Sequence, residues 1–498
     1  MKKRTPVKLA VSSGVPPSGG TGRVNVVRRL SFLCRLTVVL SLAAAFLGPE
    51  QFSAGAGQGP RNKPSSDDLV FDTAAAYLVQ FYPLWFTYNQ SSDHQNRLVG
   101  PERVTALYQT VVAINVDTIY ASAYLDLTAQ PVVVTVPPTT NTYSILELDN
   151  YCDVFDSGIP SQTPGTYALI GPNGFSGTLP AGITKVITNH LNFSSLLFRA
   201  DKYSASGVNQ IDGAEAFRAA LKLQTLSDYT NDPSGGATAV LPELAFVIPY
   251  KRIADNLIAQ DPIAFLRQLQ TAVAAPNTPP LSPELQALTN TFDTLFGNGI
   301  FGPHNRAKRA QFAAGAQAAH ALILENYLSH TGPNGWINFT NIGEWGDAVV
   351  DRSGITEFIQ YANNHSAAAY YHTFEDGKGR PLRGNNPHGY VLTFAAGQQP
   401  EASRFWSLTA YTPESIELVP NAAEKYVVAR YTPNLQTNTD GSISVYMTRD
   451  ARDLPAGVPE ANWLPIPKGP FNIMLRVYGP EGSVANATYI PPAINRRQ

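Results

Sequence analysis

The stretch AINVDTIYASAYLDL, residues 113–127, contains the clearest strand pattern of the chain. From Ile119 onward, apolar or small side chains at odd positions alternate with Tyr120, Ser122, Tyr124 and Asp126 at even positions. A period of two residues is typical of a β-strand that buries one face. The segments PVVVTVPP and NTYSILELDNY follow after short turns, so this region predicts an antiparallel meander.

Toward the C-terminus, similar short strands return after a long helical stretch. The strand candidates are GYVLTFAAG, RFWSLTAYT, KYVVARYT, SISVYMT and FNIMLRVYG. Short strands separated by turns at this spacing are typical of a sandwich or a jelly roll. The sequence therefore predicts a mainly β fold with α, in which two antiparallel β-sandwich or jelly-roll-like domains are joined by a helical segment.

Start signals mark the helical stretch between the two strand regions. A capping side chain stands directly before a proline at Asp261 and at Ser282, and proline suits the first helical position. An alanine-rich run predicts a helix over 306–330, and a further helix is expected over 354–372.

The chain is long enough for more than one domain, because 498 residues exceed what a single hydrophobic core usually organises. We expect five parts, which are a signal peptide over 1–56, a flexible leader over 57–66, an N-terminal β domain with a helical entry over 67–205, a helical linker over 206–374 and a C-terminal β-sandwich domain over 375–492.

Charge composition excludes one class of partner. Lys plus Arg number 36 and Asp plus Glu number 38, which gives a formal charge of -2 and no basic surface for phosphate groups. We therefore expect no nucleic-acid partner. A homo-oligomer stays open, because nothing in the composition speaks for or against one.

The N-terminus resembles an export signal with a long basic lead. Eight Lys or Arg residues precede an apolar run over 36–47, and the small-residue pattern Ala54-Gly55-Ala56 follows. A run of this length is shorter than the roughly 20 residues that cross a bilayer, so we expect no membrane span in the mature chain. Cleavage after Ala56 would give a secreted or periplasmic protein, and a transit peptide is the alternative.

Familiar catalytic motifs are missing from the sequence. No H-E-x-x-H, G-x-S-x-G, Walker-type loop or paired C-x-x-C occurs, so metalloprotease, serine-hydrolase, nucleotide-binding and zinc-finger functions lack support. Cys152 is the one cysteine of the expected mature chain and has no histidine in its local sequence. It is more typical of a buried small residue than of a nucleophile.

Several ordered motifs identify a family. The N-terminal ones are NVDTIY at 115–120, Asp126-Leu127, Asp149-Asn150-Tyr151 and Gly171-Pro172, which together resemble the bacterial domain of unknown function 1254. The C-terminal ones include GYVLTF at 389–394, FWSLT at 405–409, NWLP at 462–465 and Arg476 with Tyr478, which resemble its usual partner, the domain of unknown function 1214. The resemblance covers most of 67–492 and implies two β-rich domains joined by helices, often exported.

Two explanations are open for the polar residues that precede the first strand. Asn115 and Asp117 could form a turn in which their side chains accept hydrogen bonds from backbone N–H groups. Alternatively, Asp117 is in phase with Ile119 and Ala121, so an extended strand would direct its carboxylate inward, where it needs a partner. Tyr120 and Tyr124 lie on the other face and would add ring surfaces to a site.

A second acidic residue, Asp149, ends the strand candidate TYSILELDNY. We expect this strand to fold back beside the one that begins at Asp117, which would bring the two carboxylates together. Carboxylates among tyrosines can share a proton, bind a sugar's hydroxyls or hold a divalent cation, the one cofactor that the sequence suggests. Glu147 on the same face is more typical of a solvated sheet surface.

Aromatic and arginine side chains supply the C-terminal candidates. Trp463, Arg476 and Tyr478 combine flat apolar surface with a bidentate donor, a set that suits a carbohydrate, an aromatic ring or a carboxylate. Trp406 is in phase with Leu408 and Ala410 and is more typical of the core. Arg476 could equally pair with an internal acid such as Asp440.

Two classes of function follow from these residues. The first is an exported enzyme of hydrolase or isomerase type that acts on a small organic or sugar-like molecule, with Asp117, Asp149 and Tyr120 as catalytic groups. Asn115, Tyr124, Trp463, Arg476 and Tyr478 would then bind the ligand. The second is an exported protein that binds a glycan or another small ligand in the same cleft without chemistry. We favour the enzyme, because a buried polar cluster costs stability unless it is fully bonded or used.

Overall fold

The first strand forms where its alternation predicts, as β2 (Thr118–Asp126). The structure is a computed structural model that describes residues 66–91, 95–243, 249–297 and 305–498, and residues 55–498 form one compact unit. The predicted signal peptide and nearly all of the predicted leader therefore lie outside the described residues. The division of the remaining chain into domains and a linker stays a prediction.

Two sheets build the N-terminal part. A six-stranded sheet has the order β10-β1-β2-β8-β4-β5, with the further strands β10 (Ala239–Leu241), β1 (Val99–Pro101), β8 (Phe193–Asp201), β4 (Tyr143–Leu148) and β5 (Val154–Phe155). A four-stranded sheet has the order β7-β6-β3-β9, made of β7 (Lys185–Thr188), β6 (Gly165–Ile170), β3 (Val132–Val136) and β9 (Lys222–Thr225). Apolar side chains from both sheets and from α3 (Ile211–Ala220) share one core. The short helix α4 (Leu226–Asn231) follows β9.

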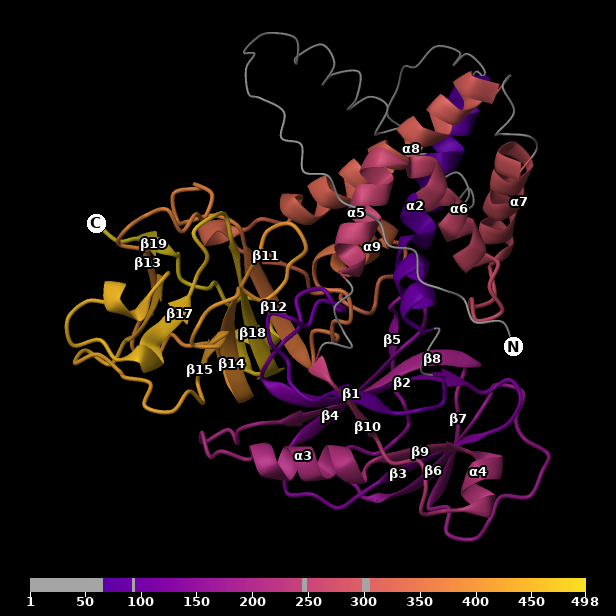
Figure 1. Ribbon diagram of the computed structural model, residues 1–498, viewed down its shortest axis with the longest axis horizontal. Helices are drawn as coiled ribbons and strands as arrows, with labels where there is room; N and C mark the ends of the chain where they lie inside the picture. The colour runs from indigo at the N-terminus through magenta and orange to yellow at the C-terminus, as the bar shows by residue number, and fades with distance from the viewer. Residues whose placement is uncertain (1–65, 92–94, 244–248, 298–304) are drawn as a thin grey trace. The chain divides into compact units, whose positions relative to one another are not determined.

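Two more sheets build the C-terminal part (Figure 1). The five-stranded sheet has the order β11-β12-β18-β14-β15, made of β11 (Ile337–Asn338), β12 (Ala368–Thr373), β18 (Asn472–Pro480), β14 (Ala402–Tyr411) and β15 (Val427–Ala429). The four-stranded sheet has the order β17-β16-β13-β19, made of β17 (Trp463–Pro465), β16 (Ile443–Thr448), β13 (Tyr390–Phe394) and β19 (Asn495–Arg496). Trp406 is fully buried in the core that these sheets share, as its phase predicts.

The long helices form one group, and most of them come from the part of the chain between the N-terminal and the C-terminal sheets. The long helix α2 (Ser66–Ser91) packs against α6 (Pro262–Val273), α7 (Pro283–Gly297), α8 (Arg306–Ser329) and α9 (Val349–Phe358), and α5 (Tyr250–Gln260) packs against α6 and α8. The Asp261 carboxylate caps α6 by accepting from the Ala264 N–H at 3.1 Å, which confirms the predicted start. Short turns complete the elements, at η3 (Pro333–Gly335), η4 (Ala451–Asp453), η5 (Glu460–Asn462) and α10 (Gly482–Ala485).

The overall fold class is more helical than the sequence predicts. Helices account for 31% and strands for 26% of the structure, so the fold is mixed α/β, with four mostly antiparallel sheets. Among the described residues, none of these sheets is closed or curled, and the jelly-roll part of the prediction stays a prediction. The helix predicted over 354–372 is wrong beyond residue 358, because α9 ends at Phe358 and Ala368–Thr373 forms strand β12 between β11 and β18. Tertiary pairing overrides the helix propensity of its alanines.

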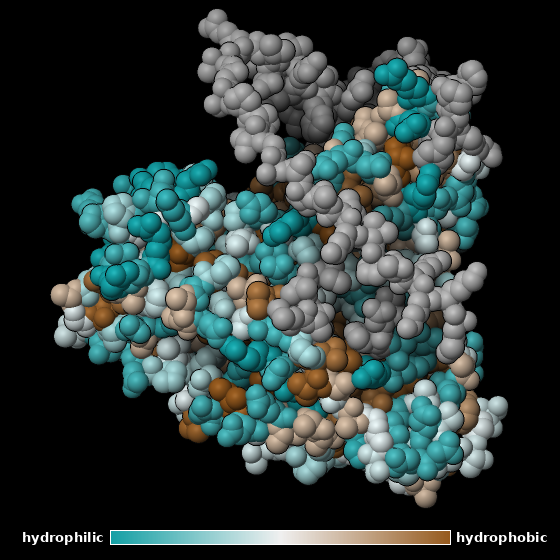
Figure 2. Space-filling model, in the orientation of Figure 1, coloured by the Kyte–Doolittle hydropathy of each residue, from teal (hydrophilic) through white to brown (hydrophobic). Residues whose placement is uncertain are grey.

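A third core joins the two halves of the chain. It contains residues from the loop before β2, such as Ile114, together with residues from α9, β12, β14 and β18, such as Phe358, Phe405 and Tyr478. On the face shown in Figure 2, hydrophilic residues cover most of the C-terminal sheets, and apolar residues form small separate groups. Within the described ranges, every helix is too short or too polar to cross a membrane.

Candidate functional site

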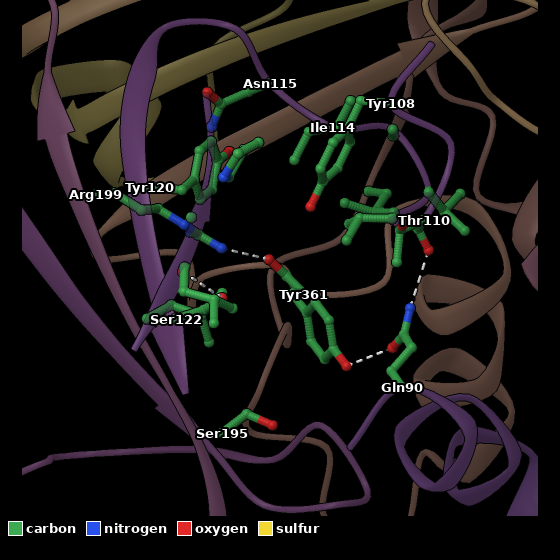
Figure 3. A pocket seen from close by; sticks show the side chains of 18 of the residues that line it. Gln90, Tyr108, Thr110, Ile114, Asn115, Tyr120, Ser122, Ser195, Arg199 and Tyr361 are labelled. Carbon is green, nitrogen blue, oxygen red and sulfur yellow. Dashed lines mark hydrogen bonds between the residues drawn. The ribbon is translucent and has the colours of Figure 1, made fainter. Parts of the chain in front are cut away.

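A cavity of about 140 Å³ lies where the six-stranded sheet, the helices and the five-stranded sheet meet. Its wall comes from β1, β2 and β8, from the loop over 108–115, from α2, α5 and the segment after α9, and from β12 and β18. Seven tyrosines line it, which are Tyr108, Tyr120, Tyr124, Tyr250, Tyr361, Tyr370 and Tyr478. Figure 3 shows this space from close by, with the Tyr108 hydroxyl facing the Arg199 guanidinium across it.

Strand alternation explains why polar side chains gather on this wall. Tyr120 pairs with Arg199 and Tyr124 pairs with Ser195 across the antiparallel β2 and β8, so all four side chains share one face. The opposite face, which carries Ile119, supplies the core between the two N-terminal sheets. The polar face of β2 and β8 is therefore the face that lines the cavity.

Strand β18 brings two of the predicted residues to the cavity from the other end of the chain. Arg476 pairs with Tyr370 of β12, and Tyr478 follows two residues later on the same face. Both side chains are buried and line the cavity. Arg476 donates to the Ala113 carbonyl oxygen and lies over the Tyr411 ring, with its guanidinium carbon 5.5 Å from the ring centre.

Asn115 forms the turn that the sequence suggests and also contacts the C-terminal half. Its Oδ1 accepts from the Asp117 N–H at 3.0 Å and from the Thr118 hydroxyl at 3.3 Å. Its Nδ2 donates to the Tyr478 hydroxyl oxygen at 2.6 Å. The turn and the cavity wall are thus two roles of one side chain.

Asp117 lies behind the wall and does not line the cavity. The side chain is fully buried and accepts from the Ser407 hydroxyl at 2.9 Å and from the Tyr431 hydroxyl. Burial raises the pKa of Asp117, while the hydrogen bond from Tyr431 and the charge of Arg476 oppose that rise. The carboxylate predicted to face inward therefore does so, and its neighbours come from β14 and from the segment after β15.

The structure does not bring Asp149 to Asp117. Strand β8 lies between β2 and β4 in the sheet, so the two strands expected to be neighbours are one strand apart. Asp149 Oδ1 instead accepts from the backbone N–H groups of Tyr151 at 2.8 Å and of Asp153 at 2.9 Å, as a turn-forming side chain does. Burial and the charge of Asp153 raise the pKa of Asp149 to about 7.

Two other predicted residues also lie away from the cavity. The Trp463 indole N–H donates to the Thr448 carbonyl oxygen at 3.1 Å within the four-stranded C-terminal sheet. Glu147 is buried rather than solvated, because Asn189 Nδ2 and the Ser194 hydroxyl each donate to it at 2.6 Å. Burial raises the pKa of Glu147 to about 7.

Sequence reasoning missed Arg199 and Tyr361, which connect β8, the segment after α9 and α2 by hydrogen bonds at the cavity. Arg199 donates to the Tyr361 carbonyl oxygen at 2.9 Å, and the Tyr361 hydroxyl donates to Gln90 Oε1 at 2.5 Å, as Figure 3 shows. The available signal was a single arginine inside the apolar strand FSSLLFRAD, since a buried charge needs a reason. Tyr361 lies in an irregular segment after α9, where no pattern predicts orientation.

A separate ionisable cluster lies among the helices. One ligand atom from each of Asp255, His320 and Glu357 lies within 4.8 Å of the others, a spacing that a divalent cation could use. Lys251 occupies this cluster, since its ammonium group donates to Asp255 at 2.9 Å and also to Glu357, and Tyr82 donates to Glu357 as well. The lysine supplies the positive charge that the two acids need, so we assign no metal to the cluster.

In comparisons with known proteins, each half of the chain matches a protein family. Residues 94–225 match the family described as Protein of unknown function (DUF1254), and residues 367–482 match Protein of unknown function (DUF1214). The crystal structure of the VPA0106 protein from Vibrio parahaemolyticus is similar with a TM-score of 0.53 and 20% identity, covering 87% of this chain and 100% of that one. A putative uncharacterized protein from Burkholderia cenocepacia gives a TM-score of 0.39 at 13% identity, with 94% and 98% coverage. No curated protein matches the chain.

Proposed function

Because the chain pairs a DUF1254 domain with a DUF1214 domain, and neither family description states an activity, we propose its function from the cavity: it binds one small organic molecule there. The observation that carries this proposal is that both family domains contribute buried polar groups to a single cavity, with Arg199 from one and Arg476 from the other. Convergent polar groups on an apolar and aromatic wall are the usual character of a ligand site.

The size of the cavity limits the ligand. Its volume of about 140 Å³ is close to that of an engineered protein cavity of about 150 Å³ that accepts benzene. One six-membered ring with a short substituent therefore fits. A glycan longer than one unit would have to extend beyond the cavity.

A cavity-filling variant tests this proposal without a known ligand. We expect Ser195→Phe, which places a ring in the cavity, to lose the thermal shifts that a fragment library produces in the wild type. Ser206→Phe is the control, since Ser206 lies on an exposed loop. If Ser195→Phe keeps the same shifts as the wild type, the fragments bind elsewhere and the proposal fails.

An enzyme is the second candidate function, and Tyr120 is the observation that favours it. Tyr120 lines the cavity beside Arg199, whose guanidinium carbon is 5.7 Å from the Tyr120 ring centre. Burial raises the pKa of Tyr120 although the charges of Arg199 and Arg476 oppose that rise, so the hydroxyl stays protonated and can donate its proton to a bound ligand. Proton transfer alone supports an isomerase-type reaction. The described residues of the lining include no Asp or Glu, so Asp117 and Asp149 act at most through other groups.

Tyr120→Phe separates the two candidates once a ligand is known. An enzyme that uses the hydroxyl should keep its ligand affinity in this variant and lose turnover. A pure binding protein shows no turnover in the wild type, and the variant then changes affinity alone.

Export is a proposal of its own, carried by the basic lead and the apolar run over 36–47. We propose that the mature protein is secreted or periplasmic and begins near Gly57. N-terminal sequencing of the exported protein tests this, because an intact Met1 on exported material would contradict cleavage.

A further inference from the structure

Two buried guanidinium groups line the cavity, and they come from opposite halves of the chain. Arg199 is 4% exposed and Arg476 is 2% exposed. Arginine stays charged at any pH at which a protein is folded, so each group brings a full positive charge into a place with little water. Buried charges of this kind normally have an ionic partner.

Neither guanidinium has such a partner in the described part of the chain. Arg199 donates to the carbonyl oxygen of Tyr361, and Arg476 donates to the carbonyl oxygen of Ala113, both of which are neutral acceptors. No ion pair involves either residue among the described ranges. By contrast, the mostly buried Arg404 pairs with Asp201.

Each arginine also keeps a buried N–H group without a hydrogen-bond partner among the described residues. These groups are Arg199 Nε and Arg476 Nη1, and the Ser195 hydroxyl on the same wall is likewise unpaired. Leaving a buried donor unpaired is costly, and the cost is larger for a charged group. Three such groups around one cavity indicate that a ligand supplies the missing acceptors.

Asp117, the buried acid behind this wall, does not supply them. Asp117 influences Arg476 through its charge, but its oxygens already accept from Ser407 and Tyr431. Among the described residues that line the cavity, none is Asp or Glu. The described lining therefore holds two positive charges and no negative one.

We infer, on the basis of the proposed ligand site, that the ligand is a small monocarboxylate whose carboxylate accepts from Arg199 and Arg476 and whose body is about one ring in size. A carboxylate supplies several acceptor positions at once and matches the planar donor groups of arginine. The tyrosine rings surround the rest of the ligand with flat, largely apolar surface.

Benzoate and benzamide make a matched pair of probes, because they share a ring and differ chiefly in charge. Isothermal titration of the folded chain should give an affinity for benzoate at least about tenfold higher than for benzamide, as expected of charge-assisted hydrogen bonds. A two-ring acid such as 2-naphthoate should bind more weakly than benzoate, because the cavity is too small for it. Inorganic phosphate is included to test whether any anion suffices.

Variants assign the binding to the two arginines. Arg199→Gln and Arg476→Gln should each lower benzoate affinity by about tenfold or more and leave benzamide affinity nearly unchanged. Arg352→Gln is the control, because Arg352 is also buried, donates to a backbone carbonyl and keeps an unpaired Nε, but lies outside the cavity. Arg199→Gln should also raise the melting temperature of the unliganded protein, since it removes an unpaired buried charge, and this confirms that the variant folds.

The possible results separate this inference from the proposed function. If benzamide binds as tightly as benzoate and the cavity-filling Ser195→Phe abolishes both, the ligand site stands and the anion inference is wrong. If neither compound binds the folded wild type while library fragments still bind in the cavity, the anion inference is wrong and the ligand site stands; if no fragment binds there either, both are wrong. Phosphate binding as tight as benzoate would overturn the carboxylate assignment, and benzoate binding that survives both arginine variants would overturn the assignment to this cavity.

Discussion

At the scale of single residues, the sequence left two roles open for Asn115 and Asp117, a turn and an inward-facing acid. The structure gives the first role to Asn115 and the second to Asp117. Asn115 forms the turn and contacts Tyr478, whereas Asp117 is the buried acid that joins the N-terminal half to Ser407 and Tyr431. A buried acid with partners from a distant segment is costly to truncate, because the partners lose their acceptor and Arg476 loses a nearby negative charge.

Asp117→Ala should therefore lower the free energy of unfolding by about 3 kcal/mol, because two buried hydroxyl groups lose their acceptor. Asp117→Asn should cost less, about 1–2 kcal/mol, because the amide oxygen still accepts one of the two hydrogen bonds. Urea unfolding measures both values. Equal losses in the two variants would show that the side chain fills space rather than accepting hydrogen bonds.

Residue patterns predicted much of the cavity wall and little of its chemistry. Tyr120, Tyr124 and Asn115 could be found because they belong to one strand and its turn, where alternation assigns faces. Arg476 and Tyr478 could be found for the same reason in β18. The partners of these residues could not be found, because strand order and the path of the segment that contains Tyr361 depend on contacts between distant parts of the chain.

At the scale of secondary-structure elements, the helices are tied together by the ionisable cluster around His320. The groups that face it are Lys251 and Asp255 of α5, Glu357 of α9 and Tyr82 of α2. Burial opposes the charged imidazole, but the carboxylates of Asp255 and Glu357, which lie 3.4 Å and 3.6 Å from Nε2, outweigh it and raise the pKa of His320 to about 9. The folded state therefore holds this proton more tightly than the unfolded chain does.

The consequence is a loss of stability at alkaline pH. Because the folded pKa lies above the unfolded value of about 6.5, this stabilisation is complete below pH 6.5 and disappears as the pH rises through about 9. We expect a contribution of about 1–3 kcal/mol, measured by chemical unfolding between these pH values. His320→Gln should flatten the profile and His330→Gln, directly after the same helix, should not. An unchanged profile in His320→Gln would contradict the assignment.

Strand β1 approaches β2 closely at Gly100. A Cβ atom at Gly100 would lie 2.2 Å from the Tyr120 carbonyl oxygen, so only glycine fits there without moving the strand. Gly100→Ala should lower the free energy of unfolding by about 1–3 kcal/mol, the usual cost of overpacking. It should also lower the affinity of any ligand that contacts Tyr120. Gly297→Ala is the control, because a Cβ there meets no described atom within 4 Å. Thermal unfolding compares the two, and equal stability would contradict the clash.

Secondary structure was predicted correctly where local side-chain contacts start a helix. It was predicted wrongly where pairing with a distant strand determines the structure. The caps at Asp261 and Ser282 start helices as expected, since Asp261 accepts from Ala264 and the Ser282 hydroxyl accepts from the Leu285 N–H at 3.3 Å. The alanines of β12 favour a helix locally, but six consecutive residues of this segment pair with β18. The sequence of this segment alone does not indicate that β18 is its partner.

At the scale of the whole molecule, the two family domains share a core and a cavity. The loop before β2 packs with α9, β12, β14 and β18, and Arg404 of one domain pairs with Asp201 of the other. Each half has a core of its own, but the residues of the third core would lose their apolar partners if the halves were separated. The protein is therefore expected to unfold as one unit.

Expression of separate halves tests this dependence. The fragments 66–243 and 305–498 should each be insoluble or unfolded alone, with poorly dispersed amide signals in nuclear magnetic resonance spectra. The chain over 66–498 should give the dispersed spectrum of a folded protein. A well-folded isolated fragment would show that the shared core adds little to its stability.

The contact between Arg476 and Ala113 has a consequence for synthesis on the ribosome. The two residues are 363 positions apart, so at a translation rate of about 5–20 residues per second the cavity stays half built for roughly 20–70 s. During that interval the inner face of β2 and β8 is exposed to water and to other nascent chains. Tyrosine hydroxyls, serines and an arginine keep this face hydrated, whereas an apolar face would invite aggregation. The same polar side chains that would hold a ligand in the finished protein thus protect the unfinished one.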